Sequence, residues 1–142
     1  MRIHDVLRGK PSPEVVTISS SASVRELLAL LARHNVGALI VSDDGSSVDG
    51  IVSERDVVRR LVEDEGVLAQ PVATIMTAEV HTCEPSTGLN DLMELMTEQR
   101  VRHVPVLSEG RLTGIVSIGD VVKHRIGELE FERAQLDSYI QS

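Results

Sequence analysis

Residues 50–58 read Gly-Ile-Val-Ser-Glu-Arg-Asp-Val-Val, and residues 114–122 read Gly-Ile-Val-Ser-Ile-Gly-Asp-Val-Val. Seven of the nine positions are identical between the two stretches. Each stretch begins as an apolar run of strand length and continues, after its serine, as the start of a helix. A repeat of this kind predicts that the chain is built from two copies of one supersecondary unit.

The repeat continues upstream of these stretches at an offset of 65 residues. The identical pairs are Thr17 and Thr82, Ser21 and Ser86, Val36 and Val101, Val41 and Val106, and Gly45 and Gly110. Because identical positions recur in the same order, we expect the two copies to share one fold.

Each copy predicts the element order β-α-β-β-α. Apolar spacing predicts helices over residues 24–34 and 89–99, the first with Ser23 and Glu26 as a capping box. Strands are expected over 15–18, 38–41 and 48–52, and over 80–83, 104–107 and 112–116, followed by helices that begin at Glu54 and Ile118. This element order predicts an α/β fold of the α+β type. Because one copy is too small to close a core by itself, we expect the two copies to pack together about a pseudo-twofold axis.

The repeat divides the chain into a first motif over residues 1–65, a second motif over 66–125 and a helical tail over 126–142, all within one compact module. The lead-in at residues 5–7 is similar to residues 74–76, so we include it in the repeat. We expect the tail to extend the last helix, and its apolar stripe consists of Ile126, Leu129, Leu136 and Ile140. The stripe needs a surface to cover it, either the body of the module or a second subunit, and we favour the second subunit.

The composition argues against several classes of function. A net charge of −8 argues against nucleic acid as a partner, and 1% aromatic residues leave no platform for base stacking. There is no apolar run of the ~20 residues that a membrane span needs and no apolar N-terminal signal, so we expect a cytoplasmic protein without a membrane partner. The single cysteine precludes an intrachain disulfide, and the five histidines have no metal-ligand spacing.

The ordered pair of copies resembles the cystathionine-β-synthase (CBS) motif family over about residues 1–125. The resemblance rests on the lead-in, the strands at Thr17 and Thr82, the runs 36–41 and 101–106, and the two Gly-Ile-Val-Ser-x-x-Asp ends. It implies a Bateman module, whose clefts bind AMP, ADP, ATP or S-adenosylmethionine and whose role is regulatory.

The resemblance assigns the two Ser-x-x-Asp sets to a ribose. A carboxylate can accept two hydrogen bonds from a ribose diol, so Asp56 and Asp120 are expected to hold ribose hydroxyls, with Ser53 and Ser117 beside them. The same pattern also fits a helix N-cap, which is the structural alternative. The two roles are compatible, because a helix N-terminus favours nearby anions.

Basic residues are distributed unequally between the copies. In the first copy Arg55 is basic, and its counterpart in the second copy is Gly119. In the second copy Arg102 and His103 are basic, and the counterpart of His103 in the first copy is Ala38. We include Ala38 among the expected ligand-binding residues. The resemblance implies that the basic residues contact phosphates, which suits the planar fork of a guanidinium group, although a solvated surface is the alternative. We expect two unequal sites, and we expect the cleft that contains Asp120, the second cleft, to bind better.

The resemblance implies that backbone groups near Thr17 and Thr82 read the edges of the adenine. The expected aliphatic walls are either Ile18 and Cys83 or Val104 and Pro105.

The expected function is that of a non-catalytic sensor that binds AMP, ADP or ATP, forms a homodimer and regulates another protein. One alternative is a protein-interaction or dimerisation module without a physiological nucleotide, and another is an S-adenosylmethionine binder. We expect no enzyme and no further cofactor, because the sequence carries neither a nucleophile–base set nor a Walker-type glycine loop.

Overall fold

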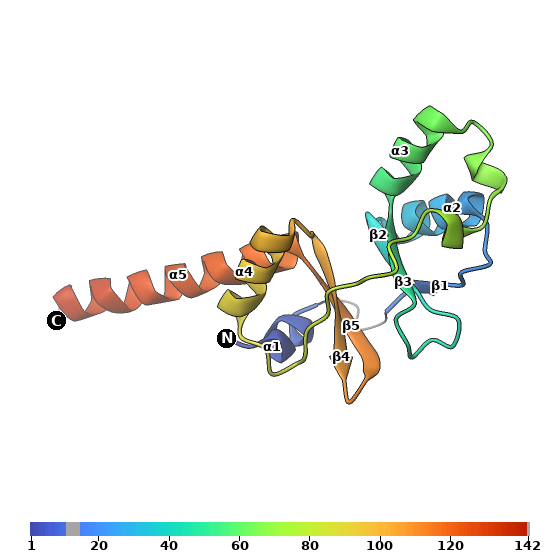
Figure 1. Ribbon diagram of the computed structural model, residues 1–142. Coiled ribbons are helices and arrows are strands. Elements are labelled where there is room, and N and C mark those ends of the chain that lie inside the picture. The colour runs from blue at the N-terminus through green and yellow to red at the C-terminus, as the bar shows by residue number, and fades with distance from the viewer. Residues whose placement is uncertain (11–14, 142) are drawn as a thin grey trace.

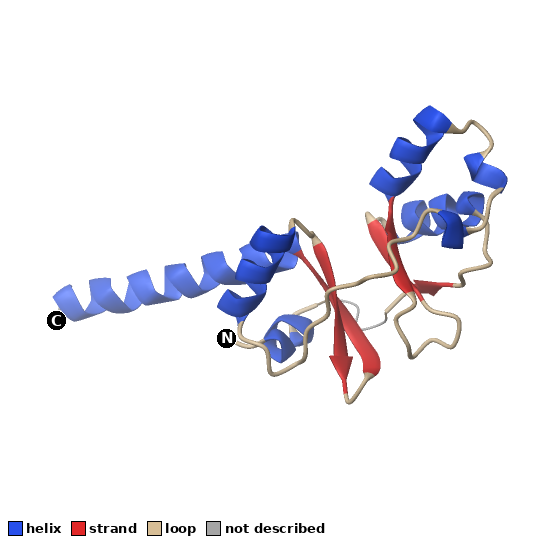
Figure 2. Ribbon diagram, viewed as in Figure 1, coloured by secondary structure: helices blue, strands red, loops and turns tan. Residues whose placement is uncertain are grey.

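The computed structural model describes residues 1–10 and 15–141, which form two halves lying side by side (Figure 1). The first half contains β1 (Thr17–Ile18), α2 (Val24–His34), β2 (Ala38–Val41), β3 (Gly50–Ser53) and α3 (Glu54–Glu63). The second half contains α4 (Leu89–Gln99), β4 (His103–Ser108), β5 (Arg111–Ser117) and α5 (Ile118–Gln141). Three short helices complete the fold: α1 (Ile3–Arg8), η1 (Val67–Ala69) and η2 (Val72–Thr74). Figure 2 shows the predicted mixed α/β architecture, with a small sheet and helices in each half.

The two amphipathic helices begin and end where their apolar spacing predicts, at 24–34 and 89–99. At the start of α2, the predicted cap is present, because Ser23 Oγ accepts a hydrogen bond of 3.1 Å from the Glu26 N–H. Its buried residues Val24, Leu27 and Leu31 recur at helical spacing and face the sheet of the first half.

The two sheets place each repeated serine in the same position. In the first half, β1 pairs in parallel with β2, and β2 pairs antiparallel with β3 so that Ala38 lies opposite Ser53. In the second half, β4 pairs antiparallel with β5, and His103 lies opposite Ser117. In each half, the helix begins directly after the last residue of a strand, and that residue is paired with the first residue of the strand before it.

The predicted strand over residues 80–83 is corrected to a single bridge. Cys83 pairs in parallel with Val106, its N–H donates to the Pro105 carbonyl at 3.0 Å, and its own carbonyl accepts from the Leu107 N–H at 2.8 Å. Only Cys83 of this stretch reaches the edge of β4, so the second sheet has two strands where the first has three.

Each half has its own apolar core, and the lead-in segments cross between the halves. Ile3 and Val6 of α1 are fully buried in the core of the second half. Val67 and Val72, which follow the first repeat, are fully buried in the core of the first half. The predicted boundary between residues 65 and 66 therefore divides the repeats along the chain but does not divide the two cores.

The tail forms the C-terminal part of α5, as predicted, and extends away from the rest of the molecule (Figure 1). Residue 142 of the predicted tail lies outside the described residues. No helix in the described part of the chain is both long enough and apolar enough to cross a membrane.

Candidate functional site

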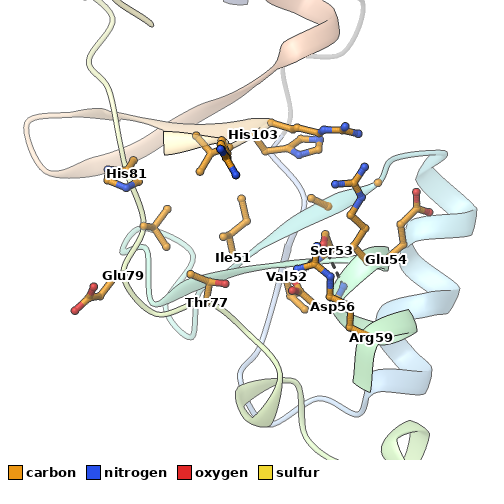
Figure 3. A pocket seen from close by; sticks show the side chains of 17 residues that line it. Ile51, Val52, Ser53, Glu54, Asp56, Arg59, Thr77, Glu79, His81 and His103 are labelled. Atoms are coloured by element: carbon orange, nitrogen blue, oxygen red, sulfur yellow. Dashed lines mark hydrogen bonds between the residues drawn. The ribbon is translucent and has the colours of Figure 1, made fainter. Parts of the chain in front are cut away.

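A cleft with a volume of about 290 Å³ lies between the two halves (Figure 3). Its lining comes from β2, β3 and the first turns of α3, from the linker after η2, and from the turn between α4 and β4. Charged or titratable side chains line much of it: Glu54, Arg55, Asp56, Arg59, Glu79, His81, Arg100, Arg102 and His103. A molecule bound here would contact both copies of the repeat.

Asp56 and Ser53 form a reciprocal cap at the N-terminus of α3, within the cleft. The Ser53 N–H donates to Asp56 Oδ2 at 2.8 Å, and the Asp56 N–H donates to Ser53 Oγ at 3.4 Å. The structural alternative for this motif is therefore present in the geometry. The hydrogen bonds that the Asp56 carboxylate accepts within the described chain end on Oδ2, which leaves Oδ1 able to accept from a ligand hydroxyl.

Asp120 and Ser117 repeat this cap at the start of α5. The Ser117 N–H donates to Asp120 Oδ2 at 2.9 Å, and the Asp120 N–H donates to Ser117 Oγ at 3.1 Å. Here a cation is added, because Lys10 Nζ lies 2.9 Å from Asp120 Oδ2. Burial acts to raise the pKa of Asp120, but hydrogen bonds from the Ser117 N–H and from Lys10 outweigh it, so the pKa lies below its ordinary value.

Four arginines line the cleft, although the whole chain carries a net charge of −8. Arg55 and Arg59 lie one turn apart on α3. Arg100 and Arg102 come from the turn after α4, where Arg100 has a left-handed backbone with φ of 54° and ends the helix. This concentration of guanidinium groups suits an anionic ligand, because each group donates in a planar fork to phosphate or carboxylate oxygens.

His103 is half-buried at the junction of the two halves and lines the cleft. Burial lowers its pKa below the ordinary value; nearby Asp120 acts in the opposite direction, while Lys10 and Arg102 act with burial. The neutral imidazole is therefore the favoured form near neutral pH, able to donate one hydrogen bond and accept another.

The remaining wall of the cleft is aliphatic. It contains Ala38, Ile51, Val52, Val80 and Val101, which come from both halves and from the linker. Such a wall can cover the face of a planar heterocycle by van der Waals contact without aromatic stacking.

The cleft brings together six of the residues singled out in the sequence: Ala38, Ser53, Arg55, Asp56, Arg102 and His103. Eight others lie outside its lining: Thr17, Ile18, Thr82, Cys83, Val104, Pro105, Ser117 and Asp120.

The four residues expected to form aliphatic walls are buried within the two halves. Ile18 is buried in the first core, and Cys83 and Val104 are buried in the second. Pro105 is also buried, within β4. Ile18, Cys83 and Val104 therefore pack within the cores of their own halves, whereas Pro105, as the neighbour of Val104 in β4, lies on the opposite face of the strand.

The sequence reasoning missed several residues of the cleft. Arg59 could have been found from its position four residues after Arg55, which places both on one helix face. Glu79 and His81 lie in an irregular linker, and Arg100 depends on the turn after α4, so no periodic pattern marks them.

Neither a metal centre nor a reactive thiol is supported. No group of three or more His, Cys, Asp or Glu side chains among the described residues could hold a metal ion. Burial raises the pKa of the Cys83 thiol to about 11, so the thiol stays protonated and poorly nucleophilic.

Comparison with known protein families gives a match that covers both copies. The model of the CBS domain matches residues 3–63 and 72–127.

Solved and curated proteins give the same picture. The CBS-domain containing protein ATU1752 from Agrobacterium tumefaciens is 42% identical, with a TM-score of 0.83, and the match covers 88% of this chain and 99% of that one. The mitochondrial CBS domain-containing protein CBSX3 from Arabidopsis thaliana is 38% identical over 124 residues, which cover 84% of this chain and 60% of the relative. The present chain therefore spans less than two thirds of that relative's length.

A third similar structure was solved with ligands. The CBS domain pair of protein MJ0100, in complex with 5′-methylthioadenosine and S-adenosyl-L-methionine, has a TM-score of 0.80 at 24% identity, covering 90% of this chain and 98% of that one. At this identity, the likeness concerns the fold.

Proposed function

This chain belongs to the CBS domain family as a pair of CBS motifs, and from that premise we propose that it is a non-catalytic regulatory module that binds an adenine nucleotide in the cleft between its halves. The observation that carries the proposal is the convergence of four arginines on one cleft of an acidic chain. Binding would favour one arrangement of the two halves, and a regulated protein would respond to that arrangement.

The ribose and phosphates have separate partners in this proposal. Asp56 offers its Oδ1 to ribose hydroxyls, while its Oδ2 keeps the cap of α3. Arg55 comes from α3 of the first half and Arg102 from the turn before β4 of the second half, so phosphates that both contact would be held by both halves. The aliphatic wall covers the base.

Adenosine derivatives without phosphates are the competing ligands. The MJ0100 pair has the same fold and was solved with two of them. S-adenosylmethionine carries a sulfonium cation, which would be repelled by the arginines of this cleft. We therefore favour AMP, ADP or ATP over S-adenosylmethionine.

The experiment is thermal unfolding of the purified protein with AMP, ADP, ATP, S-adenosylmethionine and 5′-methylthioadenosine in turn. A ligand at ~100 times its dissociation constant should stabilise the fold by about 2.7 kcal/mol, which is a shift of several degrees. Calorimetry on Arg55→Gln and Arg102→Gln should then give weaker nucleotide binding, whereas the exposed Arg25 of α2 provides the control Arg25→Gln. No shift with any nucleotide would refute the proposal, and a shift with S-adenosylmethionine alone would refute the choice of ligand.

A second candidate function is a protein-interaction module that needs no nucleotide, and the exposed stripe of α5 favours it. Ile126, Leu129, Leu136 and Ile140 are 50%, 47%, 63% and 78% exposed at helical spacing. We propose that this stripe joins two copies as a homodimer. Sedimentation velocity of the wild type and of Leu136→Glu tests the homodimer: a dimer that dissociates in the variant supports it, and a monomeric wild type at micromolar concentration contradicts it.

A further inference from the structure

The two Ser-x-x-Asp caps have the same geometry but different electrostatic partners. Both carboxylates accept the serine N–H through Oδ2, at 2.8 Å for Asp56 and 2.9 Å for Asp120. Asp120 also forms an ion pair with Lys10, at 2.9 Å. Among the described residues, no ion pair joins Asp56 to a cation.

Lys10 reaches Asp120 because the lead-in segments cross between the halves. Helix α1 is anchored in the core of the second half by Ile3 and Val6, and Lys10 follows it two residues after Arg8. The corresponding chain after η2 brings Thr77 and Glu79 to the first cleft instead. The same position of the repeat is therefore Lys10 beside Asp120 in one case and Glu79 in the cleft of Asp56 in the other.

The Lys10 ammonium is held on more than one side. It donates to Asp120 Oδ2 and also to the Ile115 carbonyl on β5. The side chains of Lys10 and Asp120 are only 24% and 28% exposed. At both aspartates the hydrogen bonds end on Oδ2, but only at Asp120 does an ammonium group also lie against that carboxylate. The ion pair neutralises the charge of Asp120, so a ribose diol would gain weaker hydrogen bonds from it than from the uncompensated carboxylate of Asp56.

We infer that Lys10 is an internal cation that neutralises Asp120 and restricts the protein to one nucleotide per chain, in the cleft that contains Asp56. This inference rests on the proposed function for the first cleft, and it reverses the expectation that the second cleft binds better. Lys10 acts as a specificity-determining residue, because it decides which of two otherwise similar caps can receive a ribose.

The test is the binding stoichiometry of AMP, and separately of ATP, by calorimetry on the wild type and on Lys10→Met. Methionine keeps the length of an unbranched side chain and removes the charge. We expect one site per chain in the wild type and two in Lys10→Met. Lys10→Arg keeps a cation and should stay at one site, and Arg8→Met, which removes an exposed cation from the same lead-in, should also stay at one.

Amide spectra locate the additional site. In Lys10→Met, saturating nucleotide should shift the amide resonances of Ser117 and Gly119. In the wild type, the same nucleotide should leave these resonances unshifted. If Lys10→Met unfolds, Lys10→Gln, which retains a donor for the Ile115 carbonyl, replaces it.

The outcomes separate this inference from the proposed function. One site in both the wild type and Lys10→Met overturns the inference alone. Two sites in the wild type and one in Lys10→Met also overturn it. No site in the wild type but one in Lys10→Met refutes the proposed first-cleft site and supports the role of Lys10. No binding in either protein overturns both.

Discussion

Ile51 and Thr77 exchange two backbone hydrogen bonds of 2.9 Å each, so the linker after η2 is held against β3 at the edge of the cleft. Both residues line the cleft (Figure 3). The linker therefore forms part of the cleft and also belongs to the packing of the first half.

Gly50, next to Ile51, should not tolerate a side chain. A Cβ there would lie 2.8 Å from both the Thr77 carbonyl oxygen and Met76 Sδ, and the carbonyl belongs to the paired backbone. We expect Gly50→Ala to lower the free energy of unfolding by about 1–3 kcal/mol, as other overpacked sites do. Urea unfolding measures it, with Gly127→Ala on α5 as the control, since that Cβ meets no atom within 4 Å and should be neutral or stabilising.

Gly114 occupies the corresponding place in the second copy, and its substitution should cost less. A Cβ at Gly114 would lie 2.7 Å from Leu7 Cδ2, which is the end of a rotatable side chain. We expect Gly114→Ala to destabilise the protein less than Gly50→Ala in the same urea experiment. The reverse order would contradict the view that the paired linker is the more rigid of the two lead-in segments.

Phosphate contacts in the cleft should depend on Arg102. If the guanidinium group donates to a phosphate, Arg102→Gln removes a hydrogen bond to a charged group, worth about 1.5–3 kcal/mol, or roughly 10- to 150-fold in affinity. Adenosine lacks the phosphate, so its affinity should change little. Calorimetry with AMP and with adenosine measures both effects, and equal losses for the two ligands would contradict the phosphate contact.

The stability of the fold should fall on mild acidification because of His103. Burial, opposed by Asp120 and Glu54 and assisted by Lys10 and Arg102, holds the pKa of His103 below its ordinary 6.5 in the folded protein. The unfolded chain therefore binds a proton at higher pH than the folded chain does, so this contribution is complete above about pH 6.5 and is lost as the pH falls.

Urea unfolding at pH 7.5 and pH 5.5 measures this effect. His103→Gln should reduce the loss of stability between the two conditions, whereas His34→Gln, at an exposed position of α2, should leave it as in the wild type. If His103→Gln loses as much free energy of unfolding between pH 7.5 and pH 5.5 as the wild type does, the pH dependence belongs to other groups.

Cys83 should react with thiol reagents only when the protein opens. Its side chain is 6% exposed in the core of the second half, and burial raises the pKa of its thiol to about 11. We expect labelling by a disulfide reagent at pH 8 to be slow in the native protein and fast in urea. Fast native labelling would mean that the bridge between Cys83 and Val106 opens readily.

Much of the local structure could be predicted from the sequence. The repeat, the helices at 24–34 and 89–99, and the change from strand to helix at both Ser-x-x-Asp sets depend on spacing and capping among neighbouring residues. Patterns of this kind involve residues that are close together in the sequence, so they can be recognised without the structure. The family resemblance and the caps were predicted from them.

The tertiary structure alone decided which residues share a site. The packing of α1 against the second half, the ion pair between Lys10 and Asp120, and the burial of Ile18 in a core rather than in the cleft all depend on contacts between residues far apart in the chain. The two copies have similar local sequences, so local pattern makes their clefts appear equivalent. The crossing of the lead-in segments is what makes them chemically different, because it brings a lysine to one aspartate and a glutamate to the cleft of the other.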